Sequence, residues 1–235
     1  MKSKAEHREE VIRRRFSNIT KVVHGNDYTL ALLSDGTVRA FGHNYFGQLG
    51  NGSHINSGCE PTQVLSTEYL GRLKNITEIK AGSEHCIALR NDGIAFTWGC
   101  NYYGQLGNGC TSDAILAIPV TDGQGHILSD IFMVDAGHEY TVVLKKDGTV
   151  WVCGRNNHGQ IGGGILVGIQ EKTMTLTQVK GVNGIGVLSE IISIESQAHC
   201  IIAETADGRR FFWGLDEFGD ITGAQKGIVK IPIKI

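Results

Sequence analysis

Three carboxylates in the sequence could form a row that binds a basic surface. Asp27, Glu84 and Glu139 recur at nearly equal intervals, and each directly precedes a tyrosine or a histidine. In a chain of repeated units, equivalent positions project from the same face, so these acidic side chains would line one rim. His138 stands beside Glu139 and adds a titratable group. The alternative is that they are simply polar residues in exposed turns.

A second candidate is an apolar, glycine-rich stretch at residues 163–169, which is longer than a turn between two strands requires. Its large apolar side chains are those of Ile165, Leu166, Val167 and Ile169. Exposed apolar side chains that lie together commonly mark a contact with another protein. The alternative is a β-ribbon or a loop that packs between repeats, which would bury them.

The other titratable residues show no pattern of an enzyme or a metal site. The remaining loop histidines are scattered, namely His24, His43, His54, His126 and His158. The six cysteines include no C-x-x-C pair, and no glycine-rich loop has the Lys-Ser or Lys-Thr of a phosphate-binding loop. We therefore predict no catalytic residues, no metal and no cofactor. A net charge of −2 gives no reason to expect direct nucleic-acid binding.

The candidate residues belong to a repeat that occurs four times. Its most regular mark is an Asp-Gly pair, found at Asp35-Gly36, Asp92-Gly93, Asp147-Gly148 and Asp207-Gly208. A repeat of this length is one supersecondary unit whose apolar faces are buried by its neighbours. The copies span residues 19–75, 76–130, 131–190 and 191–235, and we predict a single repeat domain over 19–235.

The second copy predicts the strands of one unit. Residues 76–81 and 85–89 read as two strands, and residues 94–98 return after an Asn-Asp-Gly turn. Residues 117–120 begin a fourth strand. Four short antiparallel strands are what a propeller blade requires. The predicted fold class is therefore all-β and β-propeller-like, with four blades of four antiparallel strands in a partial or small propeller.

A basic helix is expected in front of the repeats, within residues 1–18. Ser3 and Glu6 have the spacing of a capping box. Val11, Ile12 and Phe16 would form a short apolar stripe that docks on the first repeat. Such a short N-terminal α-helix would shield a sheet edge that otherwise invites the addition of another strand.

These copies resemble the repeat of the regulator of chromosome condensation family. In the second copy the resemblance covers Gly82-Ser83-Glu84-His85, Asp92-Gly93, Trp98-Gly99 and Asn101-Tyr102-Tyr103-Gly104-Gln105-Leu106-Gly107. Copies one and three replace the histidine by Tyr28 and Tyr140, and in copy four His199 lies one residue further from its Asp-Gly pair. The family's propeller has seven blades, so four copies leave three architectures open: an arc, a small closed ring, or part of a larger assembly. We expect an arc or compact partial propeller.

The resemblance implies a binding protein that engages a small GTPase, Ran-like or related, as a guanine-nucleotide exchange factor. In that family member, turns like those at Asp27, Glu84 and Glu139 face the GTPase, and a wedge acts on its nucleotide site. The segment 163–169 looks like such a wedge. The alternative is a scaffold or adaptor without exchange activity.

The cysteine pattern favours free thiols and a reducing compartment, so we expect a cytoplasmic or nuclear protein. A bacterial effector delivered to a host cytosol would suit the sequence equally well. Because no run of about 18 apolar residues is present, we expect no membrane span.

Overall fold

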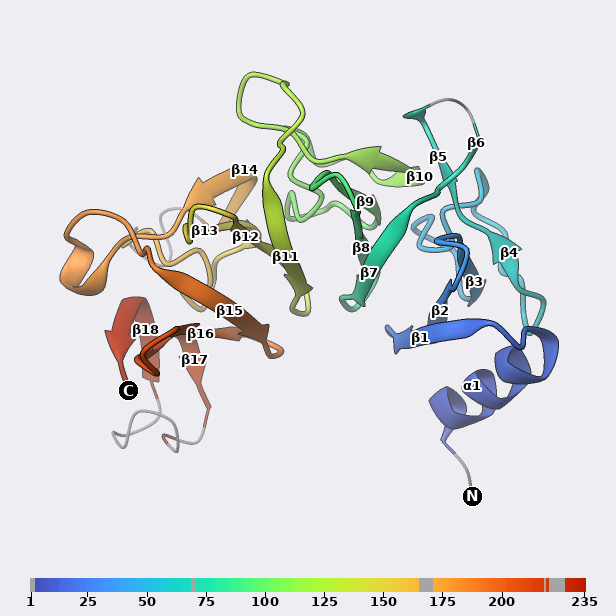
Figure 1. Ribbon diagram of the computed structural model, residues 1–235, viewed down its shortest axis with the longest axis horizontal. Helices are drawn as coiled ribbons and strands as arrows, with labels where there is room; N and C mark the ends of the chain where they lie inside the picture. The colour runs from blue at the N-terminus through green and yellow to red at the C-terminus, as the bar shows by residue number, and fades with distance from the viewer. Residues whose placement is uncertain (1–2, 69–70, 165–170, 218, 220–226) are drawn as a thin grey trace.

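The computed structural model describes residues 3–68, 71–164, 171–217, 219 and 227–235. Four β-sheets follow one another along the chain and form an open arc (Figure 1). We call these sheets blades 1 to 4, in chain order. The result confirms the all-β, propeller-like fold with an N-terminal helix.

Consecutive strands of each blade pair in antiparallel fashion. Blade 1 contains β1 (Ile19–His24), β2 (Tyr28–Leu33), β3 (Val38–Gly42) and β4 (Thr62–Gln63). Blade 2 contains β7 (Ile76–Ala81), β8 (His85–Arg90), β9 (Ala95–Gly99) and β10 (Ala114–Pro119). Blade 3 contains β11 (Ile131–Ala136), β12 (Tyr140–Lys145), β13 (Val150–Arg155) and β14 (Lys172–Gln178). Blade 4 contains β15 (Ile191–Ser196), β16 (Cys200–Thr205), β17 (Arg210–Asp216) and β18 (Gly227–Lys234), preceded by the 3-10 helix η2 (Val182–Gly184).

The Asp-Gly pairs form the tight turns between the second and third strands of the blades. In blade 1, Gly36 has a φ of +74°, a left-handed conformation that glycine adopts without steric cost. The Asp35 side chain accepts hydrogen bonds from the amide and the hydroxyl of Thr37, at 2.9 and 2.6 Å. The side chain thus closes the turn that its glycine allows.

Blade 2 is larger than the sequence predicts. A short hairpin of β5 (Leu65–Ser66) and β6 (Gly71–Arg72) joins its sheet, and Ser66 pairs with Ala117 of β10 in parallel. The sheet therefore has six strands. The chain must pass from the outer edge of blade 1 to the first strand of blade 2, and it pairs with β10 on the way. The sheet boundary consequently lies before residue 75, the repeat boundary expected from the sequence.

The hydrophobic core lies between the blades. Its three main clusters include Leu30 with Trp98 between blades 1 and 2, Ile87 with Val134 between blades 2 and 3, and Val142 with Trp213 between blades 3 and 4. A strand that is covered on both faces has no side toward solvent, so its side chains do not alternate between apolar and polar. This is why all six residues of β2 are buried.

Helix α1 (Lys4–Arg15) covers the outer face of blade 1 at one end of the arc (Figure 1). It begins with the predicted capping box, in which Ser3 and Glu6 each bond the other's backbone amide. Ile12 is fully buried against Phe41 of β3. The helix therefore occupies the place that another blade would take in a longer array.

One cross-strand pair on the outward face of blade 4, at the other end of the arc, is charged where the other blades are apolar. The equivalent cross-strand pairs of blades 1 to 3 are Leu32–Val38, Leu89–Ala95 and Leu144–Val150, and all six residues are buried. In blade 4 this pair is Glu204 and Arg210. Among the described residues, no core cluster joins blade 4 to blade 1. The architecture is thus an open arc and not a closed four-bladed ring.

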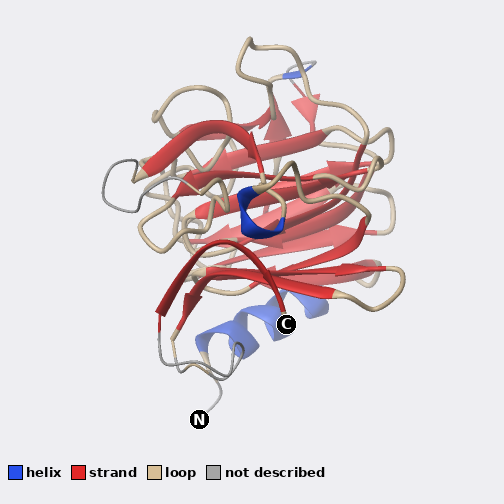
Figure 2. Ribbon diagram, turned by 90° about the vertical axis from the view of Figure 1, so that its left-hand side faces the viewer, coloured by secondary structure: helices blue, strands red, loops and turns tan. Residues whose placement is uncertain are grey.

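Seen from the side, the strands run across the molecule and the loops gather at the two ends of the strands (Figure 2). One end carries the β1–β2, β7–β8, β11–β12 and β15–β16 turns with the loops after β3, β9, β13 and β17, and we call it the loop face. The Asp-Gly hairpins lie at the opposite end. In the part of the chain that the structure describes, no helix combines the length and the apolar character needed to cross a bilayer.

Candidate functional site

The four turns of the loop face are joined to one another by backbone hydrogen bonds. The Asn26 amide donates to the Ser83 carbonyl at 2.9 Å, and the Ser83 amide donates to the His138 carbonyl at 2.9 Å. The His138 amide in turn donates to Ala198 at 3.1 Å. Residues 24–26, 81–83, 136–138 and 196–198 surround a cavity of about 270 Å³. Equivalent turns therefore lie side by side, gathered at the centre of the view in Figure 1.

A ring follows each of the first three turns and enters the core between two blades. The Tyr28 hydroxyl donates to the carbonyls of Gly82 and His85, at 3.0 and 2.7 Å. Tyr140 makes the same two bonds to blade 4. His85 is fully buried in blade 2, and desolvation lowers its pKa to about 4. The three rings thus tie each blade to the next one.

In blade 4 the ring position belongs to Cys200. The strand register pairs Cys200 with Gly214, as it pairs Tyr28 with Gly42. His199 is therefore not the counterpart of His85. Its one-residue displacement in the sequence places it at the position that holds a carboxylate in the other three turns.

Asp27 is the first of the predicted acidic residues, and it faces helix α1. Its backbone has a φ of +53°, and its carboxylate lies 3.2 Å from Lys4 Nζ and 3.5 Å from Arg8 Nη1. The hydrogen bond from Lys4 is the main cause that lowers its pKa. A cavity of about 540 Å³ adjoins it between the helix and the loop after β3. The side chain remains 37% exposed, so a partner can still reach it.

The other two acidic residues also have partners within the chain. Glu84 accepts a hydrogen bond from Gln48 Nε2 of blade 1 at 2.5 Å. Burial raises the pKa of Glu84, and the bond from Gln48 partly opposes that effect. Glu139 pairs with Arg155 Nη1 at 2.5 Å and is 31% exposed. The three carboxylates thus occupy equivalent places on one face, each held in position by a neighbour.

His138 belongs to a cluster that the sequence did not reveal. Its ring packs edge-on against His199, with centroids 4.8 Å apart. The His158 ring lies 4.7 Å from the same His199 ring. The pKa values of His158 and His199 are both lowered, mainly by desolvation and further by neighbouring cationic groups. His158 looked isolated in the sequence because its cluster forms only when blades 3 and 4 meet.

The repeated asparagine residues build the loops that follow the third strands. Asn44 Nδ2 donates to the carbonyls of Ser53 and Ile55, and Asn44 Oδ1 accepts from the Leu49 amide. Asn101 makes the corresponding bonds in blade 2. These amides are buried and fold the loop around themselves. They are structural and do not face a partner.

Exposed tyrosines on the loop face were missed by the sequence analysis. Tyr45 is 65% exposed and Tyr102 is 66% exposed, at equivalent positions directly after Asn44 and Asn101. Lys172 Nζ lies 5.2 Å from the centre of the Tyr102 ring. Their exposure could have been predicted from their position in the repeat. The residue next to a loop-building asparagine points outward when the asparagine points inward.

The apolar side chains predicted at Ile165, Leu166, Val167 and Ile169 lie outside the described residues. The flanks of their segment are described. Gly164 donates its amide to the Lys230 carbonyl of β18 at 3.3 Å, and the Glu171 carbonyl accepts from the Asn156 amide at 2.7 Å. Both flanks therefore lie in the loop after β13, on the loop face.

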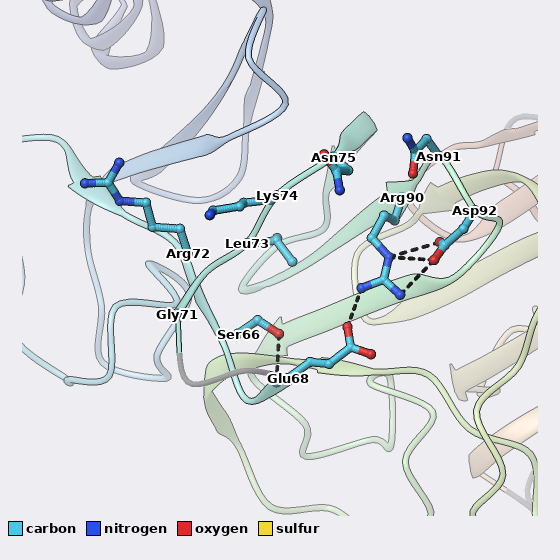
Figure 3. Close-up of a pocket in the computed structure, with 10 residues that line it drawn as sticks. All are labelled: Ser66, Glu68, Gly71, Arg72, Leu73, Lys74, Asn75, Arg90, Asn91 and Asp92. Carbon is cyan, nitrogen blue, oxygen red and sulfur yellow. Dashed lines mark hydrogen bonds and ion pairs between the residues drawn. The ribbon is translucent and has the colours of Figure 1, made fainter.

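Another cavity, of about 430 Å³, lies at the hairpin end of blade 2 (Figure 3). The Arg90 guanidinium in its wall pairs with Glu68 and with Asp92, the latter at 2.8 Å. Figure 3 shows these three side chains turned toward one another, whereas Arg72 points away. Arg90 thereby anchors the β5–β6 connection to the β8–β9 turn. Because it joins these two segments of the chain, we assign it a structural role.

Among the described residues, no group of three or more His, Cys, Asp or Glu side chains is arranged to hold a metal ion. All six cysteines are free, in agreement with the expectation of thiols. Burial raises the pKa of Cys153 to about 12, so that thiol stays protonated. It packs in the core and is not a nucleophile.

Two models of the Regulator of chromosome condensation (RCC1) repeat match this sequence. One matches residues 19–48, 76–105 and 134–160, and the other matches residues 35–89 and 92–144. Together they cover more than half of the chain and include the turns of the first three blades.

Known proteins and structures agree with this assignment. The ultraviolet-B receptor UVR8 of Arabidopsis thaliana is 29% identical over 203 residues, which cover 86% of this chain and 42% of the receptor. Human WBSCR16 superposes with a TM-score of 0.77 at 21% identity, over 94% of this chain and 54% of that one. Prp20p of Saccharomyces cerevisiae superposes with a TM-score of 0.71 at 22% identity, over 93% and 50%. The chain spans about half the length of these proteins, and it belongs to the regulator of chromosome condensation repeat family.

Proposed function

We propose that the loop face binds a small GTPase and promotes the release of its nucleotide. The observation that carries this proposal is the row of Asp27, Glu84 and Glu139 in adjoining turns. Each carboxylate is held by a neighbour in the chain, so the row has one geometry before a partner arrives. Preorganisation of this kind reduces the ordering cost of binding. The acidic row would orient a basic surface of the GTPase and speed its association.

Other features of the loop face support a protein partner. Tyr45 and Tyr102 add exposed aromatic area beside the acidic row, and aromatic residues are enriched at protein interfaces. Prp20p, whose fold this chain shares, has binding properties toward Gsp1p and histones. The segment between Gly164 and Glu171 would then act on the nucleotide site of the GTPase.

The test is the release of a fluorescent nucleotide from a panel of small GTPases that includes a Ran-like member. We expect this protein to accelerate release from at least one of them. The triple variant Asp27→Asn, Glu84→Gln, Glu139→Gln should lower the rate roughly tenfold or more, because it removes the charge of the row and keeps its shape. Glu190→Gln is the matched control, since that carboxylate lies at the hairpin end and pairs with Arg209. No acceleration with any GTPase would refute the exchange activity.

A scaffold or adaptor is the second candidate. It is favoured by the relationship to UVR8, an ultraviolet-B receptor, which shows that these repeats also occur in proteins of other named functions. GTPase binding that depends on the acidic row but leaves nucleotide release unchanged would select the adaptor. The two outcomes are separated by measuring binding and release on the same protein samples.

A further inference from the structure

Gln160 lacks a hydrogen bond that its counterpart in blade 1 makes. Gln48 Oε1 accepts from the Phe46 amide, its backbone carbonyl accepts from the Trp98 indole, and its Nε2 donates to Glu84. Gln160 repeats the first two bonds, at 2.9 Å from the His158 amide and 2.8 Å from the Trp213 indole. Its side chain is therefore placed in the same way. Its Nε2 is nevertheless a buried donor with no partner among the residues that the structure describes.

The missing partner is explained by the turn opposite. Blade 4 has His199 where blade 2 has Glu84, as the strand register shows. An imidazole replaces the carboxylate that would accept the bond from Gln160. Gln160 is fully buried, and a buried amide donor without an acceptor costs free energy. The contact between blades 3 and 4 thus has its donor, Gln160 Nε2, but not the carboxylate that accepts the equivalent bond between blades 1 and 2.

Other polar side-chain atoms in blades 3 and 4 also lack partners among the described residues. Arg155 Nε is buried without a partner, while its Nη1 holds Glu139. The Nδ1 atoms of His158 and His199 are also buried without partners. Each imidazole gains a second N–H when it is protonated. The charged and titratable groups that influence this place are His138 and Glu139 from the β11–β12 turn, Arg155, His158 and Glu171 from β13 and its loop, His199 from the β15–β16 turn, and Glu217 after β17.

We propose that a carboxylate of a bound protein, an aspartate or glutamate side chain, takes the position between blades 3 and 4 that Glu84 fills between blades 1 and 2. It would accept from Gln160 Nε2 and from His199, with Arg155 beside it. His199 is partly exposed, and its ring would have to rotate outward to admit the carboxylate. The inference rests on the proposed function only in that the loop face binds a protein. It does not require nucleotide exchange.

The pH dependence of carboxylate binding follows from the pKa values that the histidines have before a carboxylate binds. Without a carboxylate, burial and the neighbouring cationic groups lower the pKa values of His158 and His199. A bound carboxylate stabilises the protonated imidazoles and raises those pKa values. Binding therefore takes up protons, so the carboxylate should bind more tightly at pH 6 than at pH 8.

The test uses sodium acetate as the probe and the side-chain amide signal of Gln160 in ¹⁵N-labelled protein as the readout. The signal is assigned by its loss in Gln160→Leu. Acetate, inorganic phosphate and sodium chloride are titrated at equal ionic strength. We expect a saturable shift with acetate that chloride does not produce, and a larger acetate affinity at pH 6 than at pH 8. No acetate-specific shift, or a shift with phosphate alone, would overturn the proposal.

A substitution gives the second arm of the test. His199→Glu supplies an internal carboxylate, as Glu84 does in blade 2, and should weaken the acetate response about tenfold or more, the loss expected when one charge-assisted site is already filled. His126→Glu introduces the same charge at an exposed loop position and should leave the response unchanged. An undiminished response in His199→Glu would contradict the assignment. The acetate titration contains no GTPase, so its outcome does not depend on the exchange assay. A failure of the exchange assay would not contradict acetate binding, and a failure of acetate binding would not contradict exchange activity.

Discussion

At the scale of single residues, a ring and a glycine occur together in the first three turns. A Cβ placed on Gly25, Gly82 or Gly137 would lie about 2 Å from the ring of Tyr28, His85 or Tyr140. The glycine is needed for space, because none of the three has a positive φ. In blade 4 the ring is replaced by Cys200, and the glycine is replaced by Gln197. The two positions therefore depend on each other.

The first prediction tests this dependence with Gly137→Ala. The new methyl group would lie 1.9 Å from Tyr140 Cε1, so the buried ring must move and its bonds to blade 4 must weaken. We expect the free energy of unfolding to fall by about 1–3 kcal/mol, the usual cost of overpacking. Urea denaturation measures it. Gly123→Ala is the control, because a Cβ there meets no atom within 4 Å. Equal stability of the two variants would contradict the steric explanation.

The second prediction concerns His85, which is buried and neutral. Its pKa falls from 6.5 in the unfolded chain to about 4 in the folded protein. The stabilisation from neutral His85 is therefore complete above pH 6.5 and is lost as the pH falls from 6.5 toward 4, a change of about 3 kcal/mol. His85→Tyr, which copies blades 1 and 3, should lose less stability over this range. Urea denaturation between pH 7 and pH 4 provides the measurement.

The control for His85→Tyr is His126→Tyr, at an exposed position in the loop before β11. It should decline with pH as the wild type does. If His85→Tyr shows the same decline as well, the buried imidazole is not the group that titrates.

At this scale, the sequence predicted side chains that act within one turn better than those that act across blades. The role of Asp35 follows from its distance to Thr37, only two residues away. The pairing of Glu84 with Gln48 depends on how two blades pack, and no local pattern contains it. The same holds for His138, His158 and His199, which meet only across blades 3 and 4.

At the scale of elements, α1 is a cover for a sheet face and not an independent helix. Its sequence is strongly charged, and its described contacts with blade 1 centre on Ile12 and Phe16. The bidentate pair of Arg15 with Glu60 fastens its last turn to the loop after β3. The helix and its docking were predictable from the capping box and the apolar stripe. The β5–β6 hairpin was not, because two-residue strands leave no periodic pattern.

The third prediction tests the docking of α1. Ile12→Ala removes a fully buried side chain between the helix and Phe41, so we expect a loss of about 2–5 kcal/mol if the helix unfolds together with blade 1. Val11→Ala is the control, because Val11 is only partly buried and should cost less. Urea denaturation gives the loss, and limited proteolysis shows whether α1 detaches first. Equal losses in both variants would mean that Ile12 does not anchor the helix.

At the scale of the whole molecule, the arc has two different ends. Helix α1 covers blade 1, whereas the outward face of blade 4 carries Glu204 and Arg210 in place of an apolar pair. A charged pair on this face disfavours the stacking of another sheet. The repeat count in the sequence left three architectures open and favoured an arc or compact partial propeller. The charged pair at the blade 4 end depends on single residues within the last copy, and the repeat count does not reveal it.

The fourth prediction restores the apolar pair. The double variant Glu204→Leu, Arg210→Val makes blade 4 resemble blade 3 and should raise the fraction of self-associated protein. Size-exclusion chromatography with light scattering measures it, and the wild type should be monomeric. Glu190→Leu with Arg209→Val is the control, since it removes an ion pair away from this face. Identical behaviour of the two double variants would show that the blade face does not control association.

The location of the core between blades has a consequence for how the protein unfolds. Each main cluster is shared by two neighbouring blades, so no blade has a complete core of its own. Loss of an end blade removes one cluster, whereas loss of a middle blade removes two. Opening should therefore proceed inward from the ends, as in a one-dimensional array with nearest-neighbour coupling. Native-state hydrogen exchange should find the slowest amides in β8 and β12, and faster exchange in α1 and β18.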